Sequence, residues 1–318
     1  MKAGSQEKPI SEFRPLGGVV KDSDVGMRVD RYLVENFPFY SRQEWQGKIL
    51  EGSVRVTRGP LKPSHRVRMG DAFYLHHPHQ NEPEVDGEIF PIWKSGGVMA
   101  FYKPGNLPMH ENGPYRKNTF AHILRQEFGG EWAAVHRIDR ETSGIVLCGN
   151  TPELRKSLAL SLRRRTVQKK YLAIARGVPP ANSWRELGPI GDLLPSKIRI
   201  KKWVVPDGLP SETSFRVLDS IGDKVLLEAR PKTGRTNQIR IHAAYNGLPL
   251  LGDKLYHPDE GVFLEFFENR GNTSNIVEKV GGHRLCLHAS FISFTHPETG
   301  EISEVECPLP EDMQKYWN

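Results

Sequence analysis

The spacing of apolar residues first indicates a small region of helices followed by short strands, over residues 26–76. Val29, Tyr32 and Leu33 recur at the spacing of one helix face and predict a helix. Ser41, with a glutamate three residues later, has the pattern of a capping box and predicts the start of a second helix. The remaining predictions for this region are a strand over 52–56, a turn at Pro60 and Pro63, and a closing hairpin over 67–74.

From residue 98 onward the pattern predicts one larger region in which strands and helices mix. The run 144–148 is apolar throughout, which is typical of a strand buried on both faces. Residues 151–164 carry leucines at steps of four, and Thr151 and Pro152 suit the first turn of a helix. The other predicted strands cover 98–102, 171–175, 197–201, 225–229 and 290–294, and the other predicted helices cover 119–128 and 236–246.

Polar and proline-rich stretches indicate the boundaries between these regions. Residues 1–25 are expected to be a disordered lead-in, because their first part is polar and lacks the apolar segment of an export signal. Residues 77–94 are expected to be a linker. Three histidines within residues 76–79 cannot easily converge on one metal ion from such an extended segment. The expected domains are 26–76 and 95–318, with an insertion-like stretch at 261–280.

The composition of the chain indicates which kind of partner the protein binds and in which compartment it works. The chain has 318 residues, 37% of them hydrophobic, as in a soluble globular protein, and its net charge of +6 favours an anionic partner such as nucleic acid. Its three cysteines are scattered, which argues against a disulfide framework or a cysteine-based zinc site and for reduced thiols in the cytoplasm. No segment approaches the roughly 18 apolar residues of a membrane span.

Residues 136–144, which include the turn directly before the predicted buried strand, carry several charged and polar side chains that could take part in catalysis. Asp139 stands between Arg137 and Arg140 and near His136. We expect the positive neighbours to keep this carboxylate ionised well below neutral pH. An ionised aspartate can coordinate, abstract a proton or attack as a nucleophile, and the arginines can hold phosphate. The alternative is a surface ion pair worth about 0–1 kcal/mol.

Two further segments indicate contact with a nucleic acid. In residues 232–242, Arg235 and Arg240 lie near a helix start, where one arginine can face an anionic substrate while the other pairs with a carboxylate. In residues 163–171, five positive charges precede Tyr171, which combines charge for a backbone with a ring for stacking. The plainer alternatives are a basic surface helix and a solvated run of charge.

Taken in order, these motifs resemble the RluA family of pseudouridine synthases, and the resemblance covers nearly the whole chain after residue 25. Residues 26–76 are similar to an S4 RNA-binding domain. The resemblance implies an α+β fold with a largely antiparallel central sheet, preceded by the small S4-like domain. The matching segments of the larger region are 103–105, 136–144, the tract before Tyr171, 232–253 and 284–289.

The resemblance also implies roles for individual residues. Asp139 would be the catalytic aspartate, and Arg240 would pair with it. Tyr171 would stack on the flipped uracil, and Arg137 would enter the RNA stack that the uridine left. Asn237 stands where the family usually has histidine, which puts a local hydrogen bond in doubt and not the reaction. The remaining expected contacts are Arg235 and His136 with the substrate, and Arg28, Arg31, Arg163, Arg164, Arg165 and Lys169 with the RNA backbone.

The implied reaction isomerises uridine to its C-glycoside within RNA, with large-subunit ribosomal RNA as the expected substrate and tRNA as the other option. It adds and removes nothing, so we expect no cofactor and no metal, and we expect a monomer. Asp139 could attack C1′, attack C6 or abstract a sugar proton. The main alternative is a catalytically silent RNA-binding or ribosome-assembly factor, which would have no need of Asp139, Tyr171 and Arg240 together. A metal-dependent nuclease would need clustered carboxylates, and these motifs centre on one.

Overall fold

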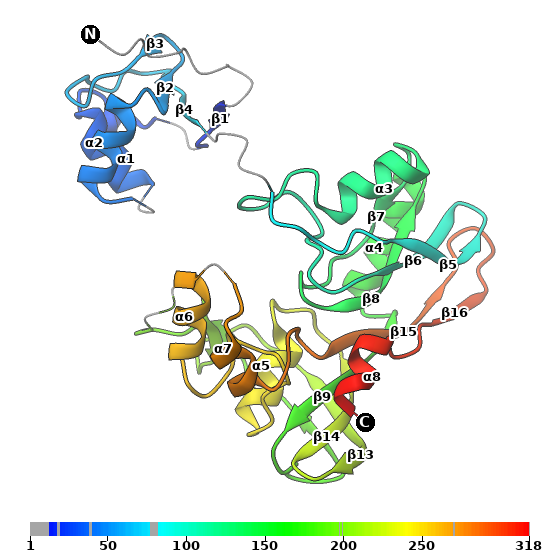
Figure 1. The fold of residues 1–318 in the computed structure, drawn as a ribbon. Helices are drawn as coiled ribbons and strands as arrows, with labels where there is room; N and C mark the ends of the chain where they lie inside the picture. The colour runs from blue at the N-terminus through cyan, green and yellow to red at the C-terminus, as the bar shows by residue number, and fades with distance from the viewer. Residues whose placement is uncertain are drawn as a thin grey trace. The chain divides into compact units, whose positions relative to one another are not determined.

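The chain divides into two compact units, Met1–Glu82 and Pro83–Asn318 (Figure 1). The computed structural model describes residues 13–17, 20–37, 40–76, 82–196, 198, 200–269 and 271–317. No helix among these residues is long and apolar enough to cross a membrane.

The N-terminal unit packs two helices against a four-stranded antiparallel sheet of order β1-β4-β2-β3. The predicted capping box begins the second helix: the Ser41 hydroxyl accepts a hydrogen bond from the Glu44 N–H, and the Glu44 carboxylate accepts one from the Ser41 N–H. Tyr32, Leu33 and Trp45 fill the core between helices and sheet. The elements are β1 (Phe13–Pro15), α1 (Val29–Asn36), α2 (Arg42–Leu50), β2 (Val54–Val56), β3 (Gly59–Pro60) and β4 (Phe73–His76).

Part of the segment expected to be a disordered lead-in belongs to this unit. Phe13–Pro15 pairs with β4, and Val20 is buried in the core. The expectation is therefore wrong for residues 13–17 and 20–25, because a short apolar segment can pair with an otherwise open sheet edge; residues 1–12, 18 and 19 lie outside the described part. The predicted hairpin over 67–74 is also wrong, since only Phe73 and Tyr74 of this range lie in a strand, and that strand, β4, pairs with β1 and β2.

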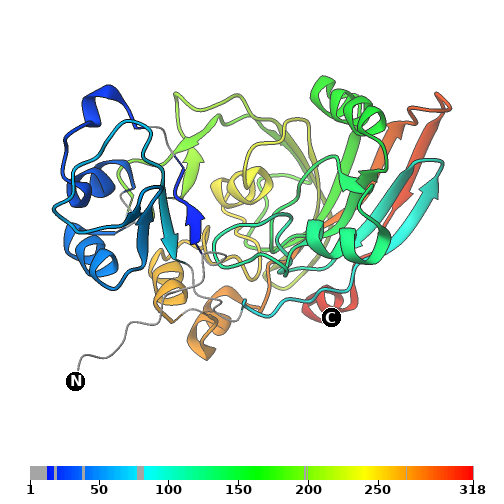
Figure 2. The same ribbon diagram turned by 90° about the horizontal axis from the view of Figure 1, so that it is seen from above.

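The C-terminal unit is built on a ten-stranded, largely antiparallel sheet, in which β8 and β15 run parallel (Figures 1 and 2). The main path has the order β10-β13-β14-β9-β15-β8-β6-β5, with β16 beside β15 and β7 beside β8. The strands are β5 (Phe90–Ser95), β6 (Val98–Lys103), β7 (Ala133–Ala134), β8 (Ser143–Gly149), β9 (Gln168–Arg176), β10 (Ser183–Glu186), β13 (Thr213–Ile221), β14 (Lys224–Pro231), β15 (Leu287–Thr295) and β16 (Ile302–Glu306), and a separate pair is formed by β11 (Ile190–Asp192) and β12 (Lys202–Val204).

Helices cover both faces of this sheet, which explains why β8 is apolar along its length. Val146 of β8 lies in the core with α3, whereas Leu147 lies in the core with Leu158 of α4. Thr151 caps α4 and Pro152 opens it, as predicted. The helices are α3 (Phe120–Phe128), α4 (Pro152–Arg164), α5 (Gln238–Tyr245), α6 (Gly261–Asn269), α7 (Ser274–Val280) and α8 (Glu311–Trp317), so that the insertion-like stretch 261–280 is a pair of helices.

Three boundaries of this unit differ from the expectations. The linker ends earlier than residue 94, because Ile89 is buried and β5 begins at Phe90; residues 77–81 lie outside the described part. Helix α5 begins at Gln238 and not at residue 236, because the backbone before it takes a left-handed turn. The strand expected over 197–201 is wrong for residues 198, 200 and 201, since pairing starts at residue 202; residues 197 and 199 are not described.

The parallel pairing of β8 with β15 fixes where the loop before β8 ends. Gly144 lies opposite Ala289 with a φ of +112°, and a side chain at Gly144 would collide with the Ala289 backbone. Glycine is needed here for both reasons. The C-terminal end of the loop that carries Asp139 is thus attached to the centre of the sheet.

Candidate active site

The three sequence motifs meet in one pocket with a cavity of about 130 Å³. The loop before β8 contributes Arg137 and Asp139, β9 contributes Tyr171, and the segment leading into α5 contributes Arg235 and Arg240. These are five of the residues that the sequence predicted for the site. The fold brings them together although up to 103 residues separate them in the chain.

Asp139 lies in a turn that the rest of the unit holds in place. The Thr142 N–H donates a hydrogen bond to the Asp139 carbonyl at 3.1 Å, and the Lys103 ammonium donates one to the Arg140 carbonyl at 3.0 Å. Burial raises the pKa of the Asp139 carboxyl above its ordinary value, against the opposing pull of Arg240 and Arg137. The arginines thus act on Asp139 in the expected direction, but burial outweighs them. A desolvated carboxylate is a stronger base and nucleophile than an exposed one.

Arg240 faces Asp139 but is held mainly by another carboxylate. Its Nε and Nη2 donate to the two carboxylate oxygens of Asp253 at 2.7 and 2.8 Å, whereas its Nη1 lies 3.9 Å from Asp139 Oδ2. Although burial opposes the charge, Asp253 raises the pKa of Arg240 above its ordinary value. Arg240 is thus a fixed positive charge beside Asp139, anchored by a bidentate pair that the sequence did not reveal.

Asn237, the departure from the family pattern, supports Arg240. Its backbone has a φ of +56° at the start of α5. Its Oδ1 accepts a hydrogen bond from Arg240 Nη1 at 3.0 Å, and its Nδ2 donates to the Tyr256 hydroxyl at 3.1 Å. The Tyr256 ring also lies under the guanidinium, 5.0 Å from ring centroid to Arg240 Cζ. Asparagine at this position thus makes hydrogen bonds with both Arg240 and Tyr256.

Tyr171 and Lys169 lie on the same face of β9, and both line the pocket. Tyr171 is buried, and its burial together with the nearby Asp139 charge raises the pKa of its hydroxyl. Lys169 was expected on the RNA backbone, but it is partly buried in the pocket, and burial lowers the pKa of its ammonium. The structure therefore places Lys169 in the same pocket as Asp139 and Tyr171.

His136 does not line the pocket, contrary to its expected contact with substrate. Its Nε2 accepts a hydrogen bond from the Leu147 N–H of β8 at 3.1 Å. Burial lowers the pKa of His136 to about 4, with Lys169 adding to the effect, so the ring is neutral at physiological pH. Its place in the structure is to support the strand behind the pocket.

The basic residues expected to contact the RNA backbone, other than Lys169, lie outside the pocket, whereas Arg235, which was expected to contact the substrate, lies in it. Arg28 pairs with Asp30 at 3.0 Å and Arg31 with Glu35 at 2.7 Å. Arg235 lines the pocket, and its Nε donates to the Pro210 carbonyl at 3.2 Å. Three consecutive arginines are exposed at the end of α4: Arg163, Arg164 and Arg165.

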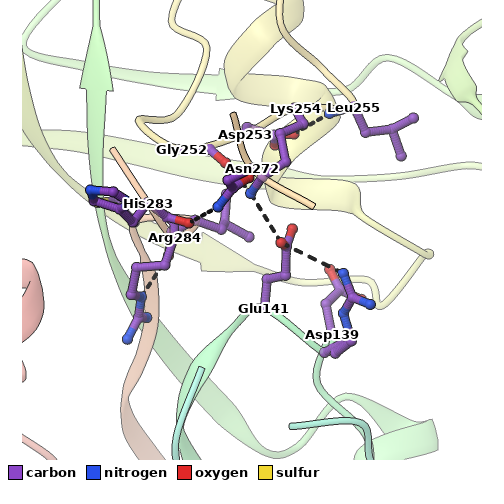
Figure 3. Close-up of polar contacts among 12 residues, drawn as sticks. Asp139, Glu141, Gly252, Asp253, Lys254, Leu255, Asn272, His283 and Arg284 are labelled. Carbon is purple, nitrogen blue, oxygen red and sulfur yellow. Dashed lines mark hydrogen bonds and ion pairs between the residues drawn. The ribbon is translucent and has the colours of Figure 1, made fainter. Parts of the chain in front are cut away.

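Several side chains of the site were assigned no role from the sequence. Thr142 lines the pocket, and its buried hydroxyl has no hydrogen-bond partner among the described residues. Lys103 is fully buried and donates to three carbonyls at 2.7 to 3.0 Å. Figure 3 shows Glu141 between Lys254 and the loop of Asp139. In the part of the chain that the structure describes, no group of histidine, cysteine, aspartate and glutamate could hold a metal ion.

Comparisons with known proteins identify the family of the chain. Residues 97–245 match the family model described as RNA pseudouridylate synthase. An uncharacterized RNA pseudouridine synthase of Chloroflexus aurantiacus is 31% identical over 98% of this chain and 96% of its own length. The ribosomal large subunit pseudouridine synthase D of Vibrio parahaemolyticus is 29% identical (94% and 92% covered), and synthase C of Escherichia coli is 28% identical (92% and 92%).

Solved structures show the same fold. The structure of human RNA pseudouridylate synthase domain containing 1 matches with a TM-score of 0.55 and 23% identity, over 71% of this chain and 86% of that one. Domain containing 4 matches with a TM-score of 0.55 and 22% identity, over 71% and 90%. The central sheet and its helices are therefore shared with proteins of that fold.

Proposed function

This chain belongs to the RluA family of RNA pseudouridine synthases, and we propose that it isomerises uridines of large-subunit ribosomal RNA. The observation that carries the substrate is the match, over more than nine-tenths of the chain, to relatives described as ribosomal large subunit enzymes. The isomerisation adds and removes no atoms, so the proposal needs no cofactor or metal. We further propose that the protein acts as a monomer in the cytoplasm.

In the proposed mechanism Asp139 is the catalytic residue, because it is the desolvated carboxylate of the pocket. Arg240 supplies a fixed positive charge within 3.9 Å of it. Tyr171 stacks on the uracil after the nucleotide leaves its helix, and Arg137, exposed at the pocket mouth, fills the vacated stack.

The N-terminal unit and the end of α4 are proposed to hold the RNA backbone. Residues 26–76 would act as an S4-like domain, with Arg28 and Arg31 facing phosphates. Both arginines keep more than two-fifths of their side chains exposed beside their acidic partners. Arg163, Arg164 and Arg165 are exposed and add three charges near the pocket-lining strand β9. Such contacts position RNA without reading its sequence.

Pseudouridine mapping of total RNA tests the substrate. Cells that lack this protein are expected to lose one or more pseudouridines of the large-subunit ribosomal RNA and to regain them when the protein is supplied. The Asp139→Asn protein, supplied in the same way, is the matched control and should restore none. Lost sites that lie in tRNA, with ribosomal RNA unchanged, would contradict the proposed substrate and leave the enzyme class intact.

Replacing Tyr171 by Leu is expected to lower kcat/KM on RNA about 5- to 150-fold, because base–aromatic stacking contributes about 1–3 kcal/mol per base. Single-turnover assays with a substrate stem-loop measure the effect. Tyr171→Phe is the matched variant: it keeps the ring, so any loss it shows measures the hydroxyl separately. A Leu variant with the wild-type rate would contradict the stacking role.

A further inference from the structure

Two consecutive residues, Asp253 and Lys254, contact the two sides of the Asp139–Arg240 pair. Asp253 binds Arg240 through both carboxylate oxygens. Lys254 Nζ lies 3.1 Å from Glu141 Oε1, on the loop that carries Asp139 (Figure 3). One short segment thus touches both the helix that carries the arginine and the loop that carries the carboxylate.

The Lys254–Glu141 contact is buried. The exposed fractions of the two side chains are 4% and 18%. Lys254 Nζ also donates to the Gly252 carbonyl at 3.1 Å and lies 5.4 Å from the centroid of the Phe266 ring on α6. Burial opposes the charge of Glu141, but attraction to nearby positive groups, Lys254 above all, lowers the pKa of its carboxyl below the ordinary value. Ion pairs with this degree of burial fix their partners more firmly than exposed pairs do.

The helical pair α6–α7 supports Lys254 from behind. The Gly252 N–H donates to the Val280 carbonyl at the end of α7 at 2.8 Å. Phe266 of α6 packs with Val262, Ile276 and Val280 in the core of the pair. The stretch 261–280, whose role the sequence did not reveal, therefore holds the segment 252–254 in place.

The loop transmits this contact to Asp139 over a short path. Glu141 is two residues from Asp139, and the turn between them is closed by the Thr142 N–H bond to the Asp139 carbonyl. A side chain at Gly105 would approach the Glu141 carbonyl to 3.2 Å, so the loop backbone is closely packed there. A shift of Glu141 must therefore move Asp139.

We propose that Lys254 is a positioning residue that sets the distance between Asp139 and Arg240 by holding the loop through Glu141. Asp253 fixes the arginine side of the pair and Lys254 fixes the carboxylate side, both from the same segment. The inference rests on the proposed catalytic role of Asp139. Misplacement of a reacting group by about 1 Å can lower a rate about 100-fold, so a small shift is enough.

The test compares Lys254→Met, Glu141→Gln and the double variant in the full-length protein. Each single change leaves one buried charge without its partner and is expected to lower Tm, whereas the double variant removes both charges and should recover much of it. We expect kcat of the double variant to fall about 10- to 100-fold with KM for RNA changed less than about twofold. Lys201→Met is the matched control, since Lys201 pairs with Glu260 at 2.8 Å and is similarly buried.

The acidic limb of the kcat/KM–pH profile separates positioning from stability. The charged groups that act on Asp139 are Arg240, Arg137 and Lys103, which lower its pKa, and Asp253, which raises it; Lys169 and Tyr171 also line its pocket. If the loop of the double variant moves away from Arg240, the arginine lowers the pKa of Asp139 less, and the acidic limb of the profile moves to higher pH. The control Lys201→Met should keep the wild-type limb and kcat.

A double variant with the wild-type kcat and an unshifted limb would overturn the inference, and so would an equal loss of kcat in Lys201→Met. Neither result affects the proposed function, which stands or falls with Asp139→Asn. If Asp139→Asn is inactive and the double variant is fully active, Asp139 is catalytic and Lys254 does not position it.

Discussion

Purified Asp139→Asn protein is expected to form no measurable pseudouridine, with turnover lowered at least about 10³-fold, as when other enzymes lose their reacting side chain. Asparagine has nearly the same shape and cannot act as a base or a carboxylate nucleophile. Phosphate contacts dominate the affinity of proteins for nucleic acids, so RNA binding should stay within about threefold of the wild type. Tritium release from labelled uridine and a filter-binding titration measure the two quantities.

The same variant should melt at the same or a higher temperature than the wild type. The pKa of Asp139 is raised in the folded protein, so ionisation costs stability there. The contribution of Asp139 to the free energy of unfolding is therefore most favourable below its unfolded pKa of 3.8, and it is lost as pH rises through the folded pKa. Asparagine removes this cost, so the difference in Tm should be present at neutral pH and vanish in acid. Substantial residual turnover would refute the catalytic role, and a lower Tm at neutral pH would show that the carboxylate stabilises the fold.

Elements with local signals could be predicted from the sequence. The capping box of α2 and the Thr-Pro start of α4 depend on residues within one helical turn, and both are present. The apolar run of β8 predicted burial on both faces, which α3 and α4 provide. The pairing of Phe13–Pro15 with β4 could not be predicted, because it depends on an edge formed by residues about 60 positions later.

The sequence motifs predicted five of the residues that line the pocket, but they did not predict the contacts among them. Sequence neighbours suggested that Arg137 and Arg140 would control the acidity of Asp139, but burial outweighs them in the fold. Arg140 instead turns to Tyr115, whose hydroxyl accepts from its Nη1 at 3.3 Å. Asp253 lies 13 residues beyond Arg240, after the end of α5, and only the turn that follows the helix brings the two together. Contacts of this kind depend on tertiary geometry that no local pattern encodes.

Lys103 illustrates the same limit. The segment 103–105 matched the family in order, but a lysine at the end of a strand gives no sign that it will be fully buried. In the structure burial lowers the pKa of its ammonium, and one of its three hydrogen bonds, to the Arg140 carbonyl, ties the end of β6 to the loop of Asp139. A matched motif can therefore identify a residue although its burial and its hydrogen bonds become known only from the fold.

Asp253→Asn is expected to destabilise the protein by about 3–5 kcal/mol and to lower kcat, because it removes the carboxylate that binds the buried Arg240 in a bidentate pair. The carboxylate has no exposed surface, and besides Arg240 it accepts the Leu255 and Tyr256 N–H groups, each at 3.0 Å. Asparagine can replace only part of these bonds. Denaturant unfolding of the two proteins at neutral pH measures the difference in free energy.

The pH dependence of that difference identifies the charge as its cause. Burial would raise the pKa of Asp253, but attraction to Arg240 and their hydrogen bonds lower it below the ordinary 3.8. The carboxylate thus contributes stability above that value, which is lost as pH falls through the folded pKa. The gap between wild type and Asp253→Asn should be constant near neutrality and shrink in acid.

The matched control is Asp192→Asn, which breaks the exposed Lys202–Asp192 pair of 2.7 Å, and it should change stability by only about 0–1 kcal/mol. An Asp253 variant as stable as this control would show that Arg240 finds other partners when Asp253 is lost. Asn237 and Asp139 are the candidates, because both already lie within 4 Å of its Nη1. A stable variant with lowered kcat would then indicate that Arg240 had moved onto Asp139, where a direct ion pair would stabilise the carboxylate and reduce its reactivity.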